Sequence, residues 1–225
     1  MIRQDNLTPQ TIKKINNFWK WFTDNEAAIN KALINFENYE EVFTHLNRNL
    51  GYISKRIGYI IKVPKKGNNQ IKIIFTAHGY RKLFGKVIGL EQQAPKLPNW
   101  KIQAFIKPAE NMEEFKQGLD HPFVFPDFEL KASELYFSIL DYNITQKKIK
   151  LIIYLKNYRF HFDNEFLEEA VFIVLQEFIG EIALHKNINF VQMAQLPDNP
   201  NKLIHLYELQ EYIDKLNRIN RKIKI

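Results

Sequence analysis

Cysteine is absent from all 225 residues of the chain. Its absence excludes disulfide bonds, thiolate nucleophiles and cysteine-ligated zinc sites together. No apolar run approaches the roughly 18 residues that a membrane-spanning helix requires. The first residues also lack the apolar core that is typical of a secretory signal. We therefore expect a soluble cytoplasmic protein.

The sequence also lacks the short motifs that mark common enzymes. It contains no HExxH, Walker, GxGxxG or GxSxG pattern, and its six histidines are scattered along the chain. One close pair of a histidine and an acid is His161 and Asp163. We expect this pair in an extended segment, where residues at this spacing point the same way. These gaps favour a protein that is not an enzyme, and we predict no metal or other cofactor.

Basic charge is concentrated in the first part of the chain. Residues 1–100 contain 16 Lys or Arg and 7 Asp or Glu, a net charge of +9, whereas residues 101–225 contain 16 and 18, a net charge of −2. Only 7 of the 32 basic residues are Arg, whose bidentate fork is favoured in nucleic-acid recognition. Nucleic acid is therefore a less favoured partner, and the basic hairpin at 55–72 is the segment that would bind it.

The segment 9–52 has the periodicity of helices. Its first helix is predicted to begin after Thr8, a capping residue, with Pro9 at the first helical position. Trp21 lies two residues after Trp19, or about 160° around this helix from it, and Trp19 belongs to the apolar stripe. One stripe cannot bury both rings. Trp21 is therefore either covered by another element, such as the following helix, or exposed and available to a partner.

From residue 57 the hydrophobic period changes to the two-residue alternation of strands. The segment 57–107 predicts a hairpin, a helix and a strand, in that order. The segment 135–195 repeats this order, with a helix near 164–179 that ends at Gly180. The sequence therefore predicts two ββαβ units.

The two predicted hairpins correspond closely. A shift of 78 positions aligns them without a gap and places Ile61 on Ile139. A slip of one residue would turn these side chains to the opposite face of the sheet. Because the inward-facing positions keep the same parity, we interpret the correspondence as an internal repeat.

These elements predict an α+β fold with an antiparallel or mixed sheet and helices mainly on one face. We expect a single domain over 1–225, in which the helices of 9–52 precede the first ββαβ unit and a closing helix spans 203–218. The sequence leaves open whether the two units share one continuous sheet.

The repeat places two Tyr-Arg pairs at corresponding positions after the hairpins. Tyr80–Arg81 follows the first hairpin, and Tyr158–Arg159 follows the second. An arginine at such a position can bind an anion or a partner's carboxylate. The alternative is a tyrosine that packs at the end of a strand beside a solvated arginine.

Three short stretches together resemble a family of bacterial hypothetical proteins. They are FWKWFTDNE (Phe18 to Glu26), LPNWKIQAF (Leu97 to Phe105) and IGE (Ile179 to Glu181), in that order. The family has no assigned activity, so the resemblance implies a bacterial cytoplasmic protein and supplies no catalytic residues. Its polar positions are Glu26 and Glu181.

The leading hypothesis is a non-enzymatic module that binds a protein or peptide, with Trp21, Trp100 and the two Tyr-Arg pairs as candidate binding residues. One alternative is a hydrolase-type enzyme. It requires Glu26, His161, Asp163 and Glu181 to converge in one pocket. A second alternative is nucleic-acid binding through the 55–72 hairpin. The sequence identifies neither the partner nor the oligomeric state.

Overall fold

The computed structural model describes residues 7–64, 70–110 and 112–222. Contacts within the chain divide it into two compact units, an N-terminal unit of residues 1–106 and a C-terminal unit of residues 107–225. Both units combine helices with a mixed sheet, so the α+β fold predicted from the sequence is confirmed. The single domain of the sequence analysis thus corresponds to two units, and each predicted ββαβ repeat lies in one of them.

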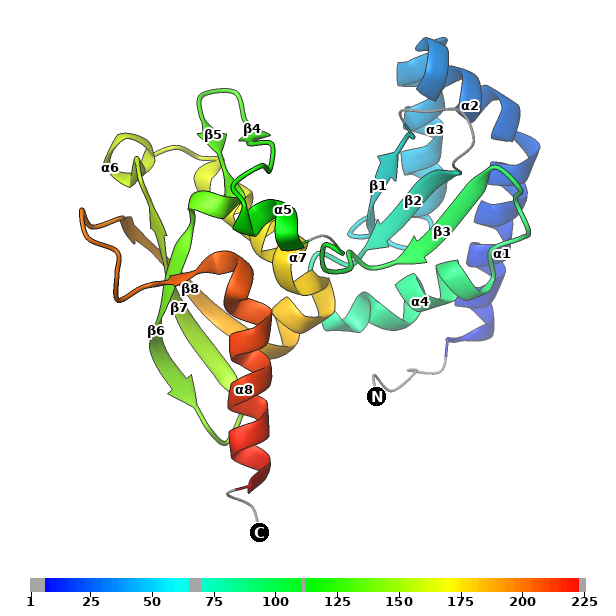
Figure 1. The fold of residues 1–225 in the computed structure, drawn as a ribbon. Helices are drawn as coiled ribbons and strands as arrows, with labels where there is room; N and C mark the ends of the chain where they lie inside the picture. Colours follow the sequence, from blue (N-terminus) through cyan, green and yellow to red (C-terminus); the bar gives the residue numbers. More distant parts are fainter. Residues whose placement is uncertain (1–6, 65–69, 111, 223–225) are drawn as a thin grey trace. The chain divides into compact units, whose positions relative to one another are not determined.

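The N-terminal unit consists of three helices followed by the first ββαβ repeat (Figure 1). Thr8 caps the first helix as predicted, because its Oγ1 accepts a hydrogen bond from the Thr11 N–H at 3.2 Å. In chain order the elements are α1 (Pro9–Asp24), α2 (Glu26–Asn35), α3 (Tyr39–Gly51), β1 (Gly58–Lys62), β2 (Ile71–Thr76), a 3₁₀ turn (Arg81–Leu83), α4 (Phe84–Gln92) and β3 (Trp100–Ala104). The expected hairpin tip at 65–69 lies outside the described residues.

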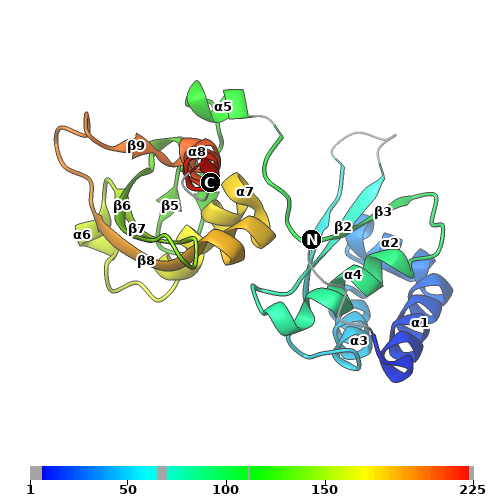
Figure 2. The ribbon, with the colours of Figure 1, turned by 90° about the horizontal axis from the view of Figure 1, so that it is seen from below.

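The sheet of this unit has the order β1-β2-β3. Strand β2 pairs antiparallel with β1 and parallel with β3. Helix α4 forms the crossover connection between β2 and β3. Helices α1, α3 and α4 lie on one side of the sheet (Figure 2). Phe75 of β2 is fully buried there, and its ring meets those of Phe18 and Trp19 of α1 at 5.9 Å each. We call this side of the sheet the inner face.

The C-terminal unit contains the second repeat and the closing helix, which begins at Leu209, six residues later than expected, because Ile204–His205 form a strand instead. Helices α7 and α8 cover one side of its four-stranded sheet, which has the order β8-β7-β6-β9 (Figure 2). Its elements are α5 (Met112–Lys116), β4 (Phe123–Val124), β5 (Glu129–Leu130), a 3₁₀ turn (Ala132–Glu134), β6 (Tyr136–Asn143), β7 (Lys148–Leu155), α6 (Tyr158–His161), α7 (Leu167–Asn187), β8 (Ile188–Gln195), β9 (Ile204–His205), a second 3₁₀ turn (Leu206–Glu208) and α8 (Leu209–Lys222).

The two repeats have the same topology, as the sequence predicted. In each one, an antiparallel hairpin is followed by a helix and by a strand parallel to the second strand of the hairpin. Ile61 is paired with Ile73 in the first hairpin, and Ile139 with Leu151 in the second, so the shift of 78 positions holds in three dimensions. Each repeat belongs to its own sheet, which answers the question that the sequence left open.

Local structure around the second crossover differs from the prediction. His161 ends the short helix α6 and is not in an extended segment, so the argument that His161 and Asp163 point the same way fails. The following helix begins at Leu167, three residues later than expected. It is interrupted at Gly180, where φ is 74° and ψ is 156°, and then continues to Asn187. Gly180 therefore ends the first helical stretch and also joins it to a second one.

Replacing Gly180 by alanine tests this joint. The observed backbone angles are accessible almost only to glycine, so Gly180→Ala should lower the free energy of unfolding by about 1–3 kcal/mol. Gly51→Ala is the matched control, because Gly51 lies in a helix and has no atom within 4 Å of an added Cβ. Urea unfolding followed by circular dichroism measures both variants. Wild-type stability in Gly180→Ala would contradict the interrupted helix.

Candidate functional site

A pocket of about 310 Å³ lies between the first three helices of the N-terminal unit. It is the larger of the two pockets described below, and it is formed entirely within this unit. We call it the Trp21 pocket. Its lining comes from the end of α1, from α2 and from α3, namely Trp21, Asn25, Ala28, Asn38, Glu41, Val42 and His45.

The Trp21 ring forms one wall of this pocket and is half-buried. It contacts Phe18 with a centroid distance of 6.4 Å, so one side of the ring packs on the core of the unit. Trp19 has the opposite role. It is 3 % exposed, and its Nε1–H donates to the Leu90 carbonyl of α4 at 2.9 Å. Trp19 is therefore a core residue, whereas Trp21 lines the pocket.

The polar side of the Trp21 pocket is formed by α3. Arg48 Nη2 donates to His45 Nδ1 at 2.5 Å, because a guanidinium has only donors. His45 Nε2 therefore faces Glu41, whose Oε1 lies 3.9 Å away. The Glu41 side chain is 73 % exposed and remains accessible to a ligand. The pocket thus combines an aromatic wall with an accessible carboxylate.

The turn between α2 and α3 stands beside the Trp21 pocket and carries two exposed aromatic residues. Phe36 is 75 % exposed and Tyr39 is 44 % exposed. Phe36 has φ 60° and ψ 19°, a left-handed conformation that is strained for a bulky residue. Asn38 also has a positive φ of 49°, which asparagine tolerates better. The turn therefore keeps a large apolar side chain in solvent at a conformational cost.

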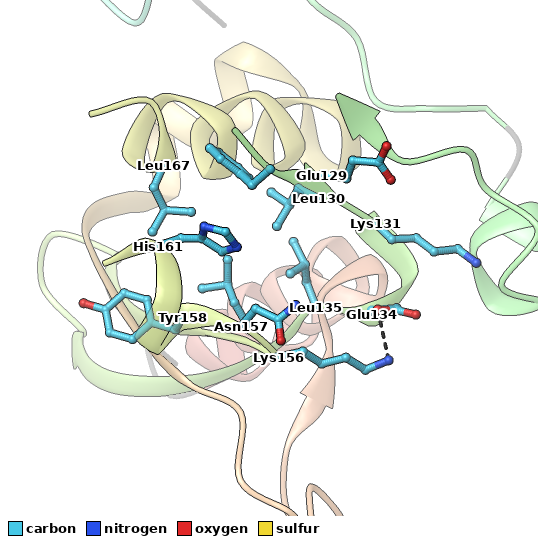
Figure 3. A pocket seen from close by; sticks show the side chains of 12 residues that line it. Glu129, Leu130, Lys131, Glu134, Leu135, Lys156, Asn157, Tyr158, His161 and Leu167 are labelled. Carbon is cyan, nitrogen blue, oxygen red and sulfur yellow. Dashed lines mark ion pairs between the residues drawn. The ribbon is translucent and has the colours of Figure 1, made fainter. Parts of the chain in front are cut away.

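A second pocket, of about 70 Å³, lies in the C-terminal unit (Figure 3). The His161 side chain points into it towards Leu130, and its ring meets that of Phe128 at 5.3 Å. The Tyr158 ring points away from the centre of the pocket. An ion pair of 3.0 Å between Lys156 and Glu134 crosses the rim. This volume holds a few water molecules rather than a substrate.

The four residues of the enzyme hypothesis share no pocket described here. Glu26 belongs to the N-terminal unit and the other three to the C-terminal unit. Only His161 lines a pocket described here. Glu181 is 1 % exposed in α7, and Asp163 is exposed beyond α6. Within the described part of the chain, no group of three or more His, Asp or Glu side chains could hold a metal ion.

The two Tyr-Arg pairs occupy corresponding places, since each opens the short helical segment after the second strand of its hairpin. The surroundings differ. The Tyr80 ring is 50 % exposed and lies 5.2 Å from Cζ of Arg56. The Arg159 N–H donates to Gln195 Oε1 at 3.2 Å. The side chains of Arg81 and Arg159 are exposed, and neither lines a described pocket.

Trp100, also a candidate binding residue, is part of the core. It is 4 % exposed, and its ring meets that of Phe22 at 4.9 Å. Its Nε1 is buried without a hydrogen-bond partner among the described residues. Phe22 of the FWKWFTDNE stretch thus packs on Trp100 of the LPNWKIQAF stretch in the core of the N-terminal unit. Their role in the structure is to join α1 to β3.

Sequence reasoning found Trp21 but missed the rest of its pocket. Asn25 lies between α1 and α2, Asn38 precedes α3, and Glu41 and His45 belong to α3, so the four residues share no motif. The one available signal was the spacing of Asn38, Glu41 and His45 at three and four residues, which places them on one face of a helix. That spacing alone does not show which element faces them.

Comparison of the chain with family models, curated proteins and solved structures finds no match. Among the described residues, no helix is long and apolar enough to cross a membrane. The features of the chain that indicate a function are therefore the geometry of the Trp21 pocket and the surfaces around it.

Unfolding of two tryptophan variants tests the assignment of Trp19 to the core and Trp21 to the pocket. Trp19→Ala should cost about 3–5 kcal/mol, because it removes a buried ring and a buried hydrogen bond. Trp21→Ala should cost less, about 1–3 kcal/mol, because its ring is only partly buried. Chemical denaturation gives both values. Equal losses would place Trp21 in the core and remove it as a binding surface.

Proposed function

We propose that the chain is a non-enzymatic interaction module that binds a peptide segment through the Trp21 pocket. The observation that carries the proposal is one pocket lined by both the half-buried Trp21 ring and the accessible carboxylate of Glu41. This combination suits a basic side chain of the partner. A cation is attracted to the face of an indole ring, and a carboxylate pairs with an ammonium or guanidinium group.

The size of the pocket supports a single long side chain as its occupant. Its volume of about 310 Å³ lies at the lower end of the range for ligand sites, about 300–1,000 Å³. The partner's lysine or arginine would enter with its aliphatic stem along Trp21 and Val42 and its charge at Glu41. The neighbouring backbone of the partner would then lie against the exposed turn between α2 and α3.

Charge around the pocket favours the same partner. Residues 36–48, which include the Arg48 beside His45, contain three Glu and one Arg, a net charge of −2, although residues 1–100 as a whole carry +9. This local reversal makes the pocket the acidic part of a basic unit. Complementary charge steers a basic segment to this place and away from the rest of the surface.

The exposed aromatic residues beside the pocket provide apolar contact area. Phe36 and Tyr39 are large, exposed, and close in the chain to Asn38, which lines the pocket. Aromatic side chains supply much of the binding energy at protein interfaces. The strained φ of Phe36 fits this role, since unfavourable conformations persist where function requires them.

Selection of random peptides on the intact chain tests the proposal. The selected peptides should be enriched in Arg or Lys, and they should bind Trp21→Ala and Glu41→Gln at least about tenfold more weakly than the wild type. Glu40→Gln is the matched control, because Glu40 is an exposed neighbour that does not line the pocket. Peptides without basic residues, or unchanged binding to Trp21→Ala, would contradict the proposal.

The turn residue Phe36 gives a test in which stability and binding change in opposite directions. Phe36→Asn should raise the free energy of unfolding by about 1 kcal/mol, because asparagine tolerates the left-handed conformation. It should also weaken binding of the selected peptides, since the exposed ring is lost. Calorimetry measures the stability and titration the affinity. A destabilised variant that binds normally would show that Phe36 serves the fold alone.

A further inference from the structure

Three lysines form a row across the sheet of the N-terminal unit. Lys62 of β1 is paired with Lys72 of β2, and Lys72 is paired with Lys101 of β3. Directly paired residues in a sheet project from the same face. Phe75 lies on the inner face, and Lys72 is an odd number of residues away, so the row projects from the opposite, outer face.

The lysine row is accessible to solvent. Lys62 and Lys101 are exposed, and Lys72 is half-buried. Strands β1, β2 and β3 contain no Asp or Glu at all. In the described part of the chain, no carboxylate pairs with any of the three ammonium groups. The next row of paired residues on the outer face contains Ile74 and Gln103, which are buried. The lysine row therefore lies at one end of the outer face.

Protection of sheet edges explains only part of this arrangement. Charged side chains on edge strands prevent unwanted pairing with other chains, which accounts for Lys62 on β1 and Lys101 on β3. Lys72 lies on the central strand, where no edge needs protection. Like charges placed directly opposite each other destabilise a sheet, and Lys72 has one on each side. An anionic ligand would turn this unfavourable arrangement into a binding site.

We propose that the Lys62–Lys72–Lys101 row binds the phosphate backbone of a nucleic acid. Neighbouring strands are about 4.8 Å apart, so the row presents positive charge over about 10 Å. This is a linear array that can follow successive phosphates along a strand. The row carries no base-reading aromatic or amide of its own, so the contact is with the backbone and independent of sequence.

The sequence around the lysine row also has a positive net charge. Residues 42–106 contain 12 Lys or Arg and a single acidic residue, Glu91, a net charge of +11. A field of this size attracts polyanions to the sheet surface before contact is made. The lysine composition suits this role, since an ammonium group binds phosphate as a point charge without reading bases. The proposal is independent of the Trp21 pocket, which uses other side chains.

Binding of a fluorescent single-stranded oligonucleotide and of its duplex to the full chain tests the proposal. The logarithm of the binding constant should fall with the logarithm of salt concentration, and each lysine removed should reduce the slope by about 0.7–0.9. Lys72→Gln should therefore bind about fivefold more weakly near 0.1 M salt. Lys14→Gln is the matched control. Lys14 is exposed on α1, the helix that covers the inner face, so its loss should change binding less than about twofold.

A second measurement separates loss of a ligand contact from damage to the fold. Lys72→Gln relieves like-charge repulsion, so its thermal midpoint should rise by about 2–4 °C while its affinity for the oligonucleotide falls. Trp21→Ala should leave oligonucleotide binding unchanged. Salt-independent binding, equal losses in Lys72→Gln and Lys14→Gln, or binding only to vesicles of anionic phospholipid would overturn the proposal.

Discussion

The alternation of side chains along strand β2 is the constraint on which the N-terminal unit depends. Ile71, Ile73 and Phe75 must lie beneath the helices, because Phe75 is where the rings of α1 meet the sheet. This requirement fixes the register of both neighbouring strands. It also forces Lys72 to the outer face, between Lys62 and Lys101. The alternation of side chains along β2 therefore determines both the core on the inner face and the lysine row on the outer face.

The same constraint operates in the C-terminal unit with a longer crossover. Ile73 is paired with Ile102, 29 residues later, whereas the equivalent Leu151 is paired with Val191, 40 residues later. The additional chain lies largely in the second helix, which has 21 residues in place of 9. The longer helix contributes to an apolar cluster that also contains Leu209 and Ile213 of α8. The two repeats thus share the same hairpin and differ in the length of the helix that packs on it.

Much of the fold could be predicted from the sequence because its signals are local. The Thr8 cap, the two hairpins and the parity of Ile61 and Ile139 follow from patterns within a few residues. The Trp21 pocket could not be predicted, since its shape depends on how three helices pack and on left-handed residues in a turn. The same reason explains the error at His161. No local pattern showed that the chain turns into a helix immediately after β7.

Nuclear Overhauser effects between methyl groups across the two hairpins test the shared parity most directly. The account predicts contacts of Ile61 with Ile73 and of Ile139 with Leu151, whose Cβ atoms should be about 4.5–5.5 Å apart. It also predicts contacts of Ile73 with Ile102 and of Leu151 with Val191 across the parallel pairs. Contacts displaced by one residue in either hairpin, such as Ile60 with Ile73, would contradict it.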